Sequence, residues 1–163
     1  AEDAVKDFAA AHPGNLRRWY IVRAAWLYGE GRPAFVEQFA DSILRRSPIT
    51  VAADQWRSPT WTRDFAEGLS DLLSGSYPTG TYHIVNEVKP GEATVMDVVE
   101  EIRAYLRVAS EEVKLNLVSR KDFFKIPRAP SNVLLNTKLP KLRPWREAIR
   151  EYLAIRYPLP STH

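Results

Sequence analysis

The chain has 163 residues, of which 26% are charged and 45% hydrophobic, a composition typical of one soluble domain. It has no cysteine, which excludes disulfides, a cysteine nucleophile and thiolate metal sites. The formal charge is +3, from 23 basic and 20 acidic residues scattered along the sequence, so we expect no nucleic-acid partner. No run approaches the ~20 apolar residues of a membrane span, and we expect no membrane association and a cytoplasmic location.

The first third of the chain alternates between helical patterns and apolar runs. Residues 1–11 have a helical pattern that the sequence His-Pro-Gly at 12–14 stops. The run over 19–25 is almost unbroken and rich in β-forming residues, so it predicts a strand buried on both faces, as in a parallel sheet. An apolar stripe predicts a helix over 36–46, and residues 49–53 predict a short strand.

The same alternation continues to the end of the chain. Thr94 and Asp97 have the spacing of a capping box, and Thr62 is placed to cap another helix. The expected elements are a helix over 62–75, a strand over 81–85, a helix over 95–106, a half-exposed strand over 113–117, an irregular stretch over 121–142 and a last helix from Pro144. This alternation predicts an α/β fold with parallel strand pairing.

One short motif resembles a phosphate-binding loop. Residues 29–34 (GEGRPA) fit G-x-G-x-x-A between a strand and a helix, and Asp54 follows the next strand, where a ribose-binding acid would be expected. However, residues 26–28 separate the strand from the first glycine, and Pro33 removes a backbone donor. We therefore expect an ordinary strand-to-helix loop.

Metal and hydrolase sites find no support in the sequence. His12, His83 and His163 are far apart, and none has an acidic residue at metal-binding helical spacing, so we expect no metal site. His83 lies in a predicted strand, where a hydrogen-bonded core histidine is the simplest interpretation. No G-x-S-x-G motif is present, which leaves a serine hydrolase without support.

Five stretches of the chain are similar to the motifs of one enzyme family. Residues 22–29 (VRAAWLYG) are similar to R-T-S/A-W-x-Y-G, residues 54–60 (DQWRSPT) to D-Q-x-G-x-P-T, and residues 80–86 (GTYHIVN) to G-x-Y-H-x-x-N. Residues 128–136 resemble a drifted R-P-x-N-S-x-L-x-N, and residues 142–148 (LRPWREA) complete the match. These are motifs of the dTDP-4-dehydrorhamnose reductases, which belong to the extended short-chain dehydrogenase/reductase superfamily. Their order and spacing make the resemblance fairly specific.

The resemblance implies which half of such an enzyme this chain represents. Family members open with a dinucleotide-binding half that carries a glycine-rich loop and a Tyr-x-x-x-Lys pair, and this sequence contains no Tyr-x-x-x-Lys. We therefore expect the C-terminal part of a Rossmann-like fold, with parallel strands, helices and a small substrate-binding α/β subdomain. Residues 1–53 would be remaining strands and helices of the Rossmann-like sheet, and residues 54–163 mainly the substrate subdomain. No catalytic residue is expected in this chain.

The resemblance also implies a reaction and its ligands. The family reduces dTDP-4-dehydro-L-rhamnose to dTDP-L-rhamnose with NADPH or NADH, and the absent tyrosine would protonate the keto oxygen. The implied substrate-binding residues are Trp26, Arg128 and Asn132, and the implied cofactor-binding residues are Arg23, Ala24 and Ala25. The implied partners are the dTDP-sugar and the N-terminal half of the same protein, and a homodimer is an option. A purely structural role as a core residue is the alternative for Trp26.

This sequence departs from the family motifs at three places. Arg57 replaces a glycine, Ala24 and Ala25 stand where Thr or Ser is frequent, and residues 129–132 are Ala-Pro-Ser-Asn in place of Pro-x-Asn-Ser. Two other functions therefore stay open: a related sugar-nucleotide epimerase or dehydratase, and a non-catalytic regulatory or binding subunit with the same fold. The sequence upstream of Ala1 would discriminate between the enzyme and the binding subunit.

Overall fold

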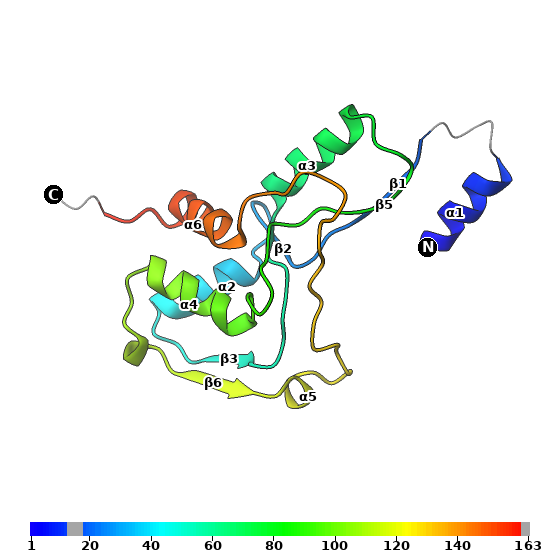
Figure 1. Ribbon diagram of the computed structural model, residues 1–163. Helices are drawn as coiled ribbons and strands as arrows, with labels where there is room; N and C mark the ends of the chain where they lie inside the picture. The colour runs from blue at the N-terminus through cyan, green and yellow to red at the C-terminus, as the bar shows by residue number, and fades with distance from the viewer. Residues whose placement is uncertain (13–17, 161–163) are drawn as a thin grey trace.

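The computed structural model describes residues 1–12 and 18–160 (Figure 1). In chain order the elements are α1 (Glu2–Ala11), β1 (Tyr20–Arg23), β2 (Leu27–Tyr28), α2 (Phe35–Leu44), β3 (Ile49–Ala52), β4 (Thr60–Trp61), α3 (Thr62–Ser74), β5 (Gly80–His83), α4 (Val95–Tyr105), the 3-10 turn η1 (Ser110–Glu112), β6 (Leu115–Val118), α5 (Arg120–Phe123) and α6 (Trp145–Arg156). The predicted mixed α/β class is confirmed.

The strands form three parallel pairs. β1 pairs with β5, β2 with β4 and β3 with β6, and in the last pair Ile49 lies opposite Leu115. The predicted parallel pairing is therefore confirmed. Each pair joins a strand from residues 1–53 to one from residues 54–163. The predicted boundary between a Rossmann-like part, residues 1–53, and a substrate subdomain, residues 54–163, stays a prediction.

Two local predictions are wrong, each for a physical reason. The expected doubly buried strand over 19–25 is shorter, and Ile21 is its one buried residue because, within the described residues, β1 has β5 as its single neighbour. Thr62 does not cap α3: it is the first helical residue, and Trp61 takes the cap position. The capping box at α4 is confirmed, because Thr94 Oγ1 accepts from the Asp97 amide at 3.0 Å and the Asp97 carboxylate accepts from the Thr94 amide at 2.9 Å.

The main core lies where α2, α4 and α6 pack together beside β3 (Figure 1). Apolar stripes at helical spacing supply its buried side chains, among them Val36, Ile102 and Trp145. A smaller cluster, formed by Leu72, Tyr82 and Ile84, lies between α3 and β5. The described residues therefore form two apolar clusters, and β1 and β5 pack in the smaller one.

A buried polar network links α3 to the segment that precedes α6. Asp64 accepts two hydrogen bonds from the Arg143 guanidinium, both at 2.9 Å, and one from Asn86 Nδ2 at 2.6 Å. Asn86 Oδ1 accepts from the Trp61 amide at 2.9 Å. The hydrogen bonds to Asp64, the first cause, raise the pKa of Arg143 well above its usual value. Across residues 1–12 and 18–160, no helix combines the length and apolar character needed to cross a membrane.

Candidate functional site

Trp26, between β1 and β2, has an unusual backbone conformation. Its φ is +44°, in the left-handed region that a bulky side chain rarely adopts. A hydrogen bond from the Thr60 amide to the Trp26 carbonyl, 3.2 Å long, ties this strained position to the start of β4. Strain of this kind is kept where surrounding contacts enforce it, and it concentrates at functional sites. The conformation therefore marks Trp26 as a candidate functional residue.

The Trp26 indole is half-buried and lies between two other side chains. It stacks on Phe35, with ring centroids 3.8 Å apart and an interplanar angle of 15°. The Arg57 guanidinium carbon lies 5.7 Å from the centroid of the same indole, a cation–π distance. Trp26 and Phe35 both pack against the main core. The position of Trp26 is therefore compatible with both predicted roles, substrate contact and core residue.

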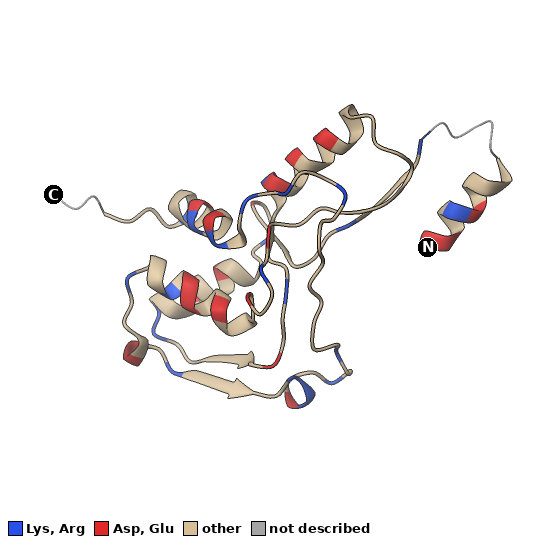
Figure 2. Cartoon of the chain, viewed as in Figure 1, with Lys and Arg blue, Asp and Glu red and all other residues tan. Residues whose placement is uncertain are grey.

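Three segments meet around the loop that follows β3. The Trp56 amide donates to the Pro130 carbonyl at 2.9 Å, and the Asn132 amide donates to the Trp56 carbonyl at 3.1 Å. On the other side, the Arg57 amide donates to the Ala93 carbonyl at 2.9 Å. The loop is thus held by backbone hydrogen bonds from both sides. Figure 2 shows Lys and Arg on this connection and around α5, where the chain returns toward it.

Arg57 connects the predicted residues Trp26 and Asn132. The groups around Asn132 assign its amide oxygen toward Arg57 Nη1, at 3.1 Å, and Arg57 Nη2 donates to Gln55 Oε1 at 2.8 Å. Burial lowers the pKa of Arg57, and the positive charge of Arg128 lowers it further. The structure therefore brings Trp26 and Asn132 together around a residue that the sequence marked only as a departure from a motif, and Arg128 belongs to the same segment as Asn132.

Arg128 itself lies at the exposed side of this group. Its guanidinium carbon is 5.6 Å from the centroid of the Phe124 ring, and its carbonyl accepts from Arg120 Nε at 3.1 Å. Arg120 also binds Asp54: the Asp54 carboxylate accepts from the Arg120 backbone amide at 2.6 Å, and this bond, the first cause, lowers the Asp54 pKa. Asp54 therefore anchors the start of α5, which accounts for it without a ribose.

The three residues predicted to contact the cofactor lie at the end of β1. Ala24 is exposed and Ala25 is half-buried, while the Arg23 guanidinium pairs with Glu2 of α1, with Nε 2.7 Å from Oε1. His83 lies beside Arg23, with Nε2 3.4 Å from Nη1, and its Nδ1 is 3.0 Å from the Leu135 carbonyl oxygen. His83 is thus hydrogen-bonded but half-exposed, so the expectation of a core histidine is wrong: β1 and β5 form an open pair.

The glycine-containing loop between β2 and α2 has a structural explanation. A Cβ at Gly29 would lie 1.9 Å from Thr62 Oγ1, so glycine permits the close approach of β2 to α3. Ala34 is the N-cap of α2, where its amide donates to the Glu37 carboxylate at 2.9 Å. These contacts agree with the expected strand-to-helix loop. No group of three or more acidic or histidine side chains is placed to hold a metal ion in the described part of the chain.

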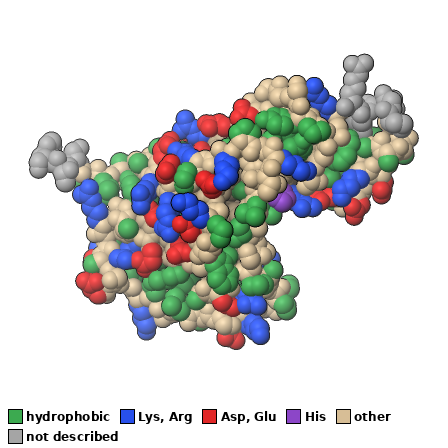
Figure 3. Space-filling model, in the orientation of Figure 1, with side chains coloured by type: hydrophobic (Ala, Val, Ile, Leu, Met, Phe, Trp, Pro, Cys, Tyr) green, Lys and Arg blue, Asp and Glu red, His purple; other side chains and the backbone are tan. Residues whose placement is uncertain are grey.

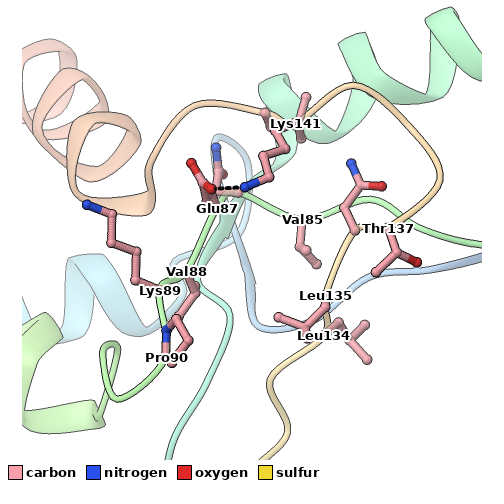
Figure 4. Close-up of a pocket in the computed structure, with 12 residues that line it drawn as sticks. Val85, Glu87, Val88, Lys89, Pro90, Leu134, Leu135, Thr137 and Lys141 are labelled. Carbon is pink, nitrogen blue, oxygen red and sulfur yellow. Dashed lines mark hydrogen bonds and ion pairs between the residues drawn. The ribbon is translucent and has the colours of Figure 1, made fainter.

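A pocket of about 380 Å³ lies next to the site, between the segment after β5 and the segment before α6 (Figure 4). Val85, Val88 and Leu134 give it an apolar lining, and Lys141 pairs with Glu87 at its rim. The Leu134 amide donates to Ser58 Oγ at 3.0 Å, which connects the pocket to the loop that carries Arg57. Val85 and Leu134 lie in two of the motif stretches, but no pattern in the sequence predicts a pocket there, because its apolar residues come from two segments without periodic structure.

Comparison with known proteins places this arrangement in a family. The RmlD substrate binding domain family matches residues 2–157. The spore coat polysaccharide biosynthesis protein SpsK of Bacillus subtilis is 33% identical over 138 residues, covering 82% of this chain and 46% of the relative. A dTDP-4-dehydrorhamnose reductase of Mycolicibacterium smegmatis is 30% identical over 158 residues, covering 88% of this chain and 46% of the relative. The chain spans about half the length of these relatives.

Solved structures share the fold. A dTDP-4-dehydrorhamnose reductase from Bacillus anthracis, solved in complex with NADP, aligns with a TM-score of 0.76 and 24% identity over 93% of this chain and 53% of that chain. A UDP-glucose 4-epimerase from Thermus thermophilus, solved in complex with NAD, aligns with a TM-score of 0.71 and 18% identity over 97% of this chain and 52% of that chain. The extended Rossmann-like fold expected from the motifs is confirmed, and the chain belongs to the RmlD substrate binding domain family.

Proposed function

We propose that this chain is the nucleotide-sugar-binding half of an NAD(P)H-dependent reductase that converts dTDP-4-dehydro-L-rhamnose to dTDP-L-rhamnose. The observation that carries the proposal is the convergence of Trp26, Arg57 and Asn132 beyond the ends of parallel strands, where open α/β sheets bind ligands. Relatives named dTDP-4-dehydrorhamnose reductase support the choice of substrate.

In this proposal the chain's residues bind and orient the sugar nucleotide. The Trp26 indole offers an aromatic surface against a sugar ring, and its stacking on Phe35 fixes the plane of that surface. Asn132 and Arg128 belong to one segment that lies against the Arg57 loop, so they would hold the nucleotide from the opposite side. Fixing the sugar in this way determines which face of the keto carbon accepts hydride.

Ala24 and Ala25 fit the edge of a nicotinamide site. Their side chains are small, they follow the carboxyl end of a parallel strand, and the neighbouring Arg23 is held in place by Glu2. The bound cofactor would supply the hydride. We propose NADPH or NADH, bound mainly by an N-terminal half of the same protein that also supplies the proton donor. We place the enzyme in the cytoplasm and include a homodimer among its assemblies.

Calorimetric titration of the chain with dTDP and with UDP tests the proposal. We expect dTDP to bind more tightly, because the site would accept a thymidine nucleotide. Equal affinity for the two nucleotides, or no binding of either, would contradict the proposed substrate.

A second assay concerns turnover. The chain alone should not oxidise NADPH or NADH in the presence of dTDP-4-dehydro-L-rhamnose, because its sequence has no Tyr-x-x-x-Lys. Loss of cofactor absorbance that depends on the keto sugar would contradict this assignment of roles.

A further inference from the structure

The pocket between the segment after β5 and the segment before α6 presents an apolar surface (Figure 4). Half of its twelve lining residues are apolar: Val85, Val88, Pro90, Leu134, Leu135 and Leu142. Leu135 is 60% exposed, and Figure 4 shows the Val85 side chain directed toward Leu134 and Leu135. Its volume of about 380 Å³ and its mainly apolar lining are typical of a small-molecule site. The lining includes no residue of the proposed nucleotide-sugar site, so this pocket is a separate one.

The two side-chain amides in the lining already have hydrogen-bond partners within the chain. Asn86 is fully buried, and both its Oδ1 and its Nδ2 belong to the polar network around Asp64. Asn136 Nδ2 donates to the Pro140 carbonyl at 3.0 Å, and its Oδ1 accepts from the Leu139 amide at 3.0 Å. A polar molecule in this pocket would therefore lose hydrogen bonds to water without replacing them. The body of a ligand that fits here is apolar.

The charged side chains of the lining lie at the rim of the pocket. They are Glu87, Lys89 and Lys141, which together carry one net positive charge. Lys141 pairs with Glu87, but its side chain is 69% exposed, and an ion pair so exposed contributes little stability. An ammonium group has three donors, so Lys141 can bind a second anionic group while it keeps Glu87. The rim therefore favours a ligand whose head group is negatively charged.

We propose that this pocket binds a small amphiphilic monoanion, a medium-chain carboxylate. Its alkyl chain would lie against Val85, Leu134 and Leu135, and its carboxylate would reach the Lys141 ammonium at the rim. The chain length is limited by the pocket, because an alkyl chain gains from burial only as far as the apolar lining extends. This site goes beyond the proposed reductase function and does not depend on it.

NMR titration of the isotope-labelled 163-residue chain with octanoate, acetate and 1-octanol tests the site. Octanoate should shift the backbone amide signals of residues 85–90 and 134–142, where the lining residues lie. Acetate has the charge without the alkyl chain and should bind at least about tenfold more weakly. 1-Octanol has the alkyl chain without the charge and should bind about threefold more weakly, because the rim charges are exposed to solvent.

A substitution in the apolar lining tests the position of the alkyl chain. Leu135→Ser should weaken octanoate binding about fivefold, because it removes an apolar side chain from the lining. Leu73→Ser is the matched control: Leu73 on α3 is also 60% exposed but lies outside the pocket, so its loss should leave the affinity unchanged. Thermal melts establish that both variants are folded.

Two substitutions at the rim should change the affinity in opposite directions. Lys141→Gln removes the cation and should weaken octanoate binding about threefold, while Glu87→Gln removes the competing carboxylate and should strengthen it about threefold. Damage to the fold would weaken binding in both variants, so opposite signs identify the charges as the cause. Lys114→Gln is the control for the change in net charge, because Lys114 is exposed and lies outside the lining; it should leave the affinity unchanged.

Four results would overturn the proposal. Absence of shifts at the lining residues with about 10 mM octanoate would show that the pocket binds no such ligand. 1-Octanol binding as tightly as octanoate would show an apolar groove that does not recognise an anion, and acetate binding as tightly would show that the alkyl chain makes no contact. Unchanged octanoate affinity in Leu135→Ser, or a change of the same sign in Lys141→Gln and Glu87→Gln, would exclude the proposed arrangement in the pocket.

Discussion

Trp26 combines a strained backbone with a side chain held between an aromatic ring and a cation. Its φ of +44° places the indole beyond β1, where it reaches both Phe35 and Arg57. Ala93, a fully buried residue of the main core, also has a positive φ, of +63°, so the strain by itself does not choose between a binding role and a core role. The two roles predict different behaviour of the same variant.

Trp26→Phe should weaken dTDP-sugar binding and change the melting temperature little. Phenylalanine keeps a ring against Phe35 but loses part of the aromatic surface, which we expect to cost about 1–3 kcal/mol of binding, or about 5- to 150-fold in affinity. Calorimetry and a thermal melt measure the two quantities. Trp145→Phe, at a fully buried position of the main core, is the control and should lower the melting temperature while leaving the affinity unchanged. The same pattern in Trp26→Phe would show that Trp26 is a core residue.

Neighbouring helices and strands are held together by a close backbone approach at Gly29 and by hydrogen bonds between helix ends. Gly29 brings the end of β2 against the first residue of α3. At the other end of the main core, the Tyr157 hydroxyl, just after α6, donates to Asp41 of α2 at 2.8 Å, and the Tyr157 carbonyl accepts from the Tyr105 hydroxyl of α4 at 3.2 Å. Each contact can be tested by one substitution.

Gly29→Ala should destabilise the chain by about 1–3 kcal/mol, because the added methyl group overlaps the Thr62 side chain. Thr62→Ala removes Oγ1 and Cγ2, so the double variant should recover part of the loss. Urea unfolding of the two single variants and the double variant gives the coupling. Strictly additive losses would show that the Gly29 and Thr62 positions do not crowd each other.

Tyr157 should make the stability of the chain depend on alkaline pH. Burial, and then the hydrogen bond to Asp41, raise its pKa from 10.0 to about 12. Because the folded-state pKa is higher than the unfolded one, Tyr157 contributes stability below pH 10 and loses that contribution as the pH rises toward about 12. Urea unfolding across this range should show Tyr157→Phe less stable than the unmodified chain at pH 9–10, with the difference shrinking toward pH 12. A difference that stays constant with pH would refute the assignment.

The sequence predicted the long helices because their signals are local, and it predicted the parallel pairing because helices and strands alternate along the chain. The apolar stripe of α4 and the Thr94–Asp97 capping box fall within one stretch of chain. By contrast, the two-residue strands β2 and β4 carry no periodic signal, and they exist because Gly29 and Thr60 bring their segments together. Arg57 was visible in the sequence as the replacement of a motif glycine, but its contact with Trp26 depends on tertiary structure.

In the described part of the chain, large apolar side chains are exposed to solvent and strand edges lack a neighbouring strand. Every sheet is a single pair of strands, so each strand has a second edge without a neighbouring strand. Several large apolar side chains are also exposed, including Leu117 on β6 at 56%, Ile126 at 71% and Phe8 on α1 at 54%. Figure 3 shows hydrophobic side chains gathered on the face that carries β6. Such surfaces favour association.

We therefore expect the chain to self-associate as its concentration rises. Strand edges offer backbone hydrogen bonds, and exposed apolar side chains add burial when two copies meet. Leu117→Lys places a charge beside the open β6 strand and should weaken association about tenfold, because a lysine on an edge strand opposes pairing. Ala104→Lys, at an exposed position of helix α4 away from any strand edge, tests whether charge alone has this effect and should weaken association less. Sedimentation velocity over a concentration series measures the change, and binding of a hydrophobic dye reports the exposed surface. A single monomeric species at every concentration, without dye binding, would show that these edges and side chains are too polar or too dispersed to drive contact between copies.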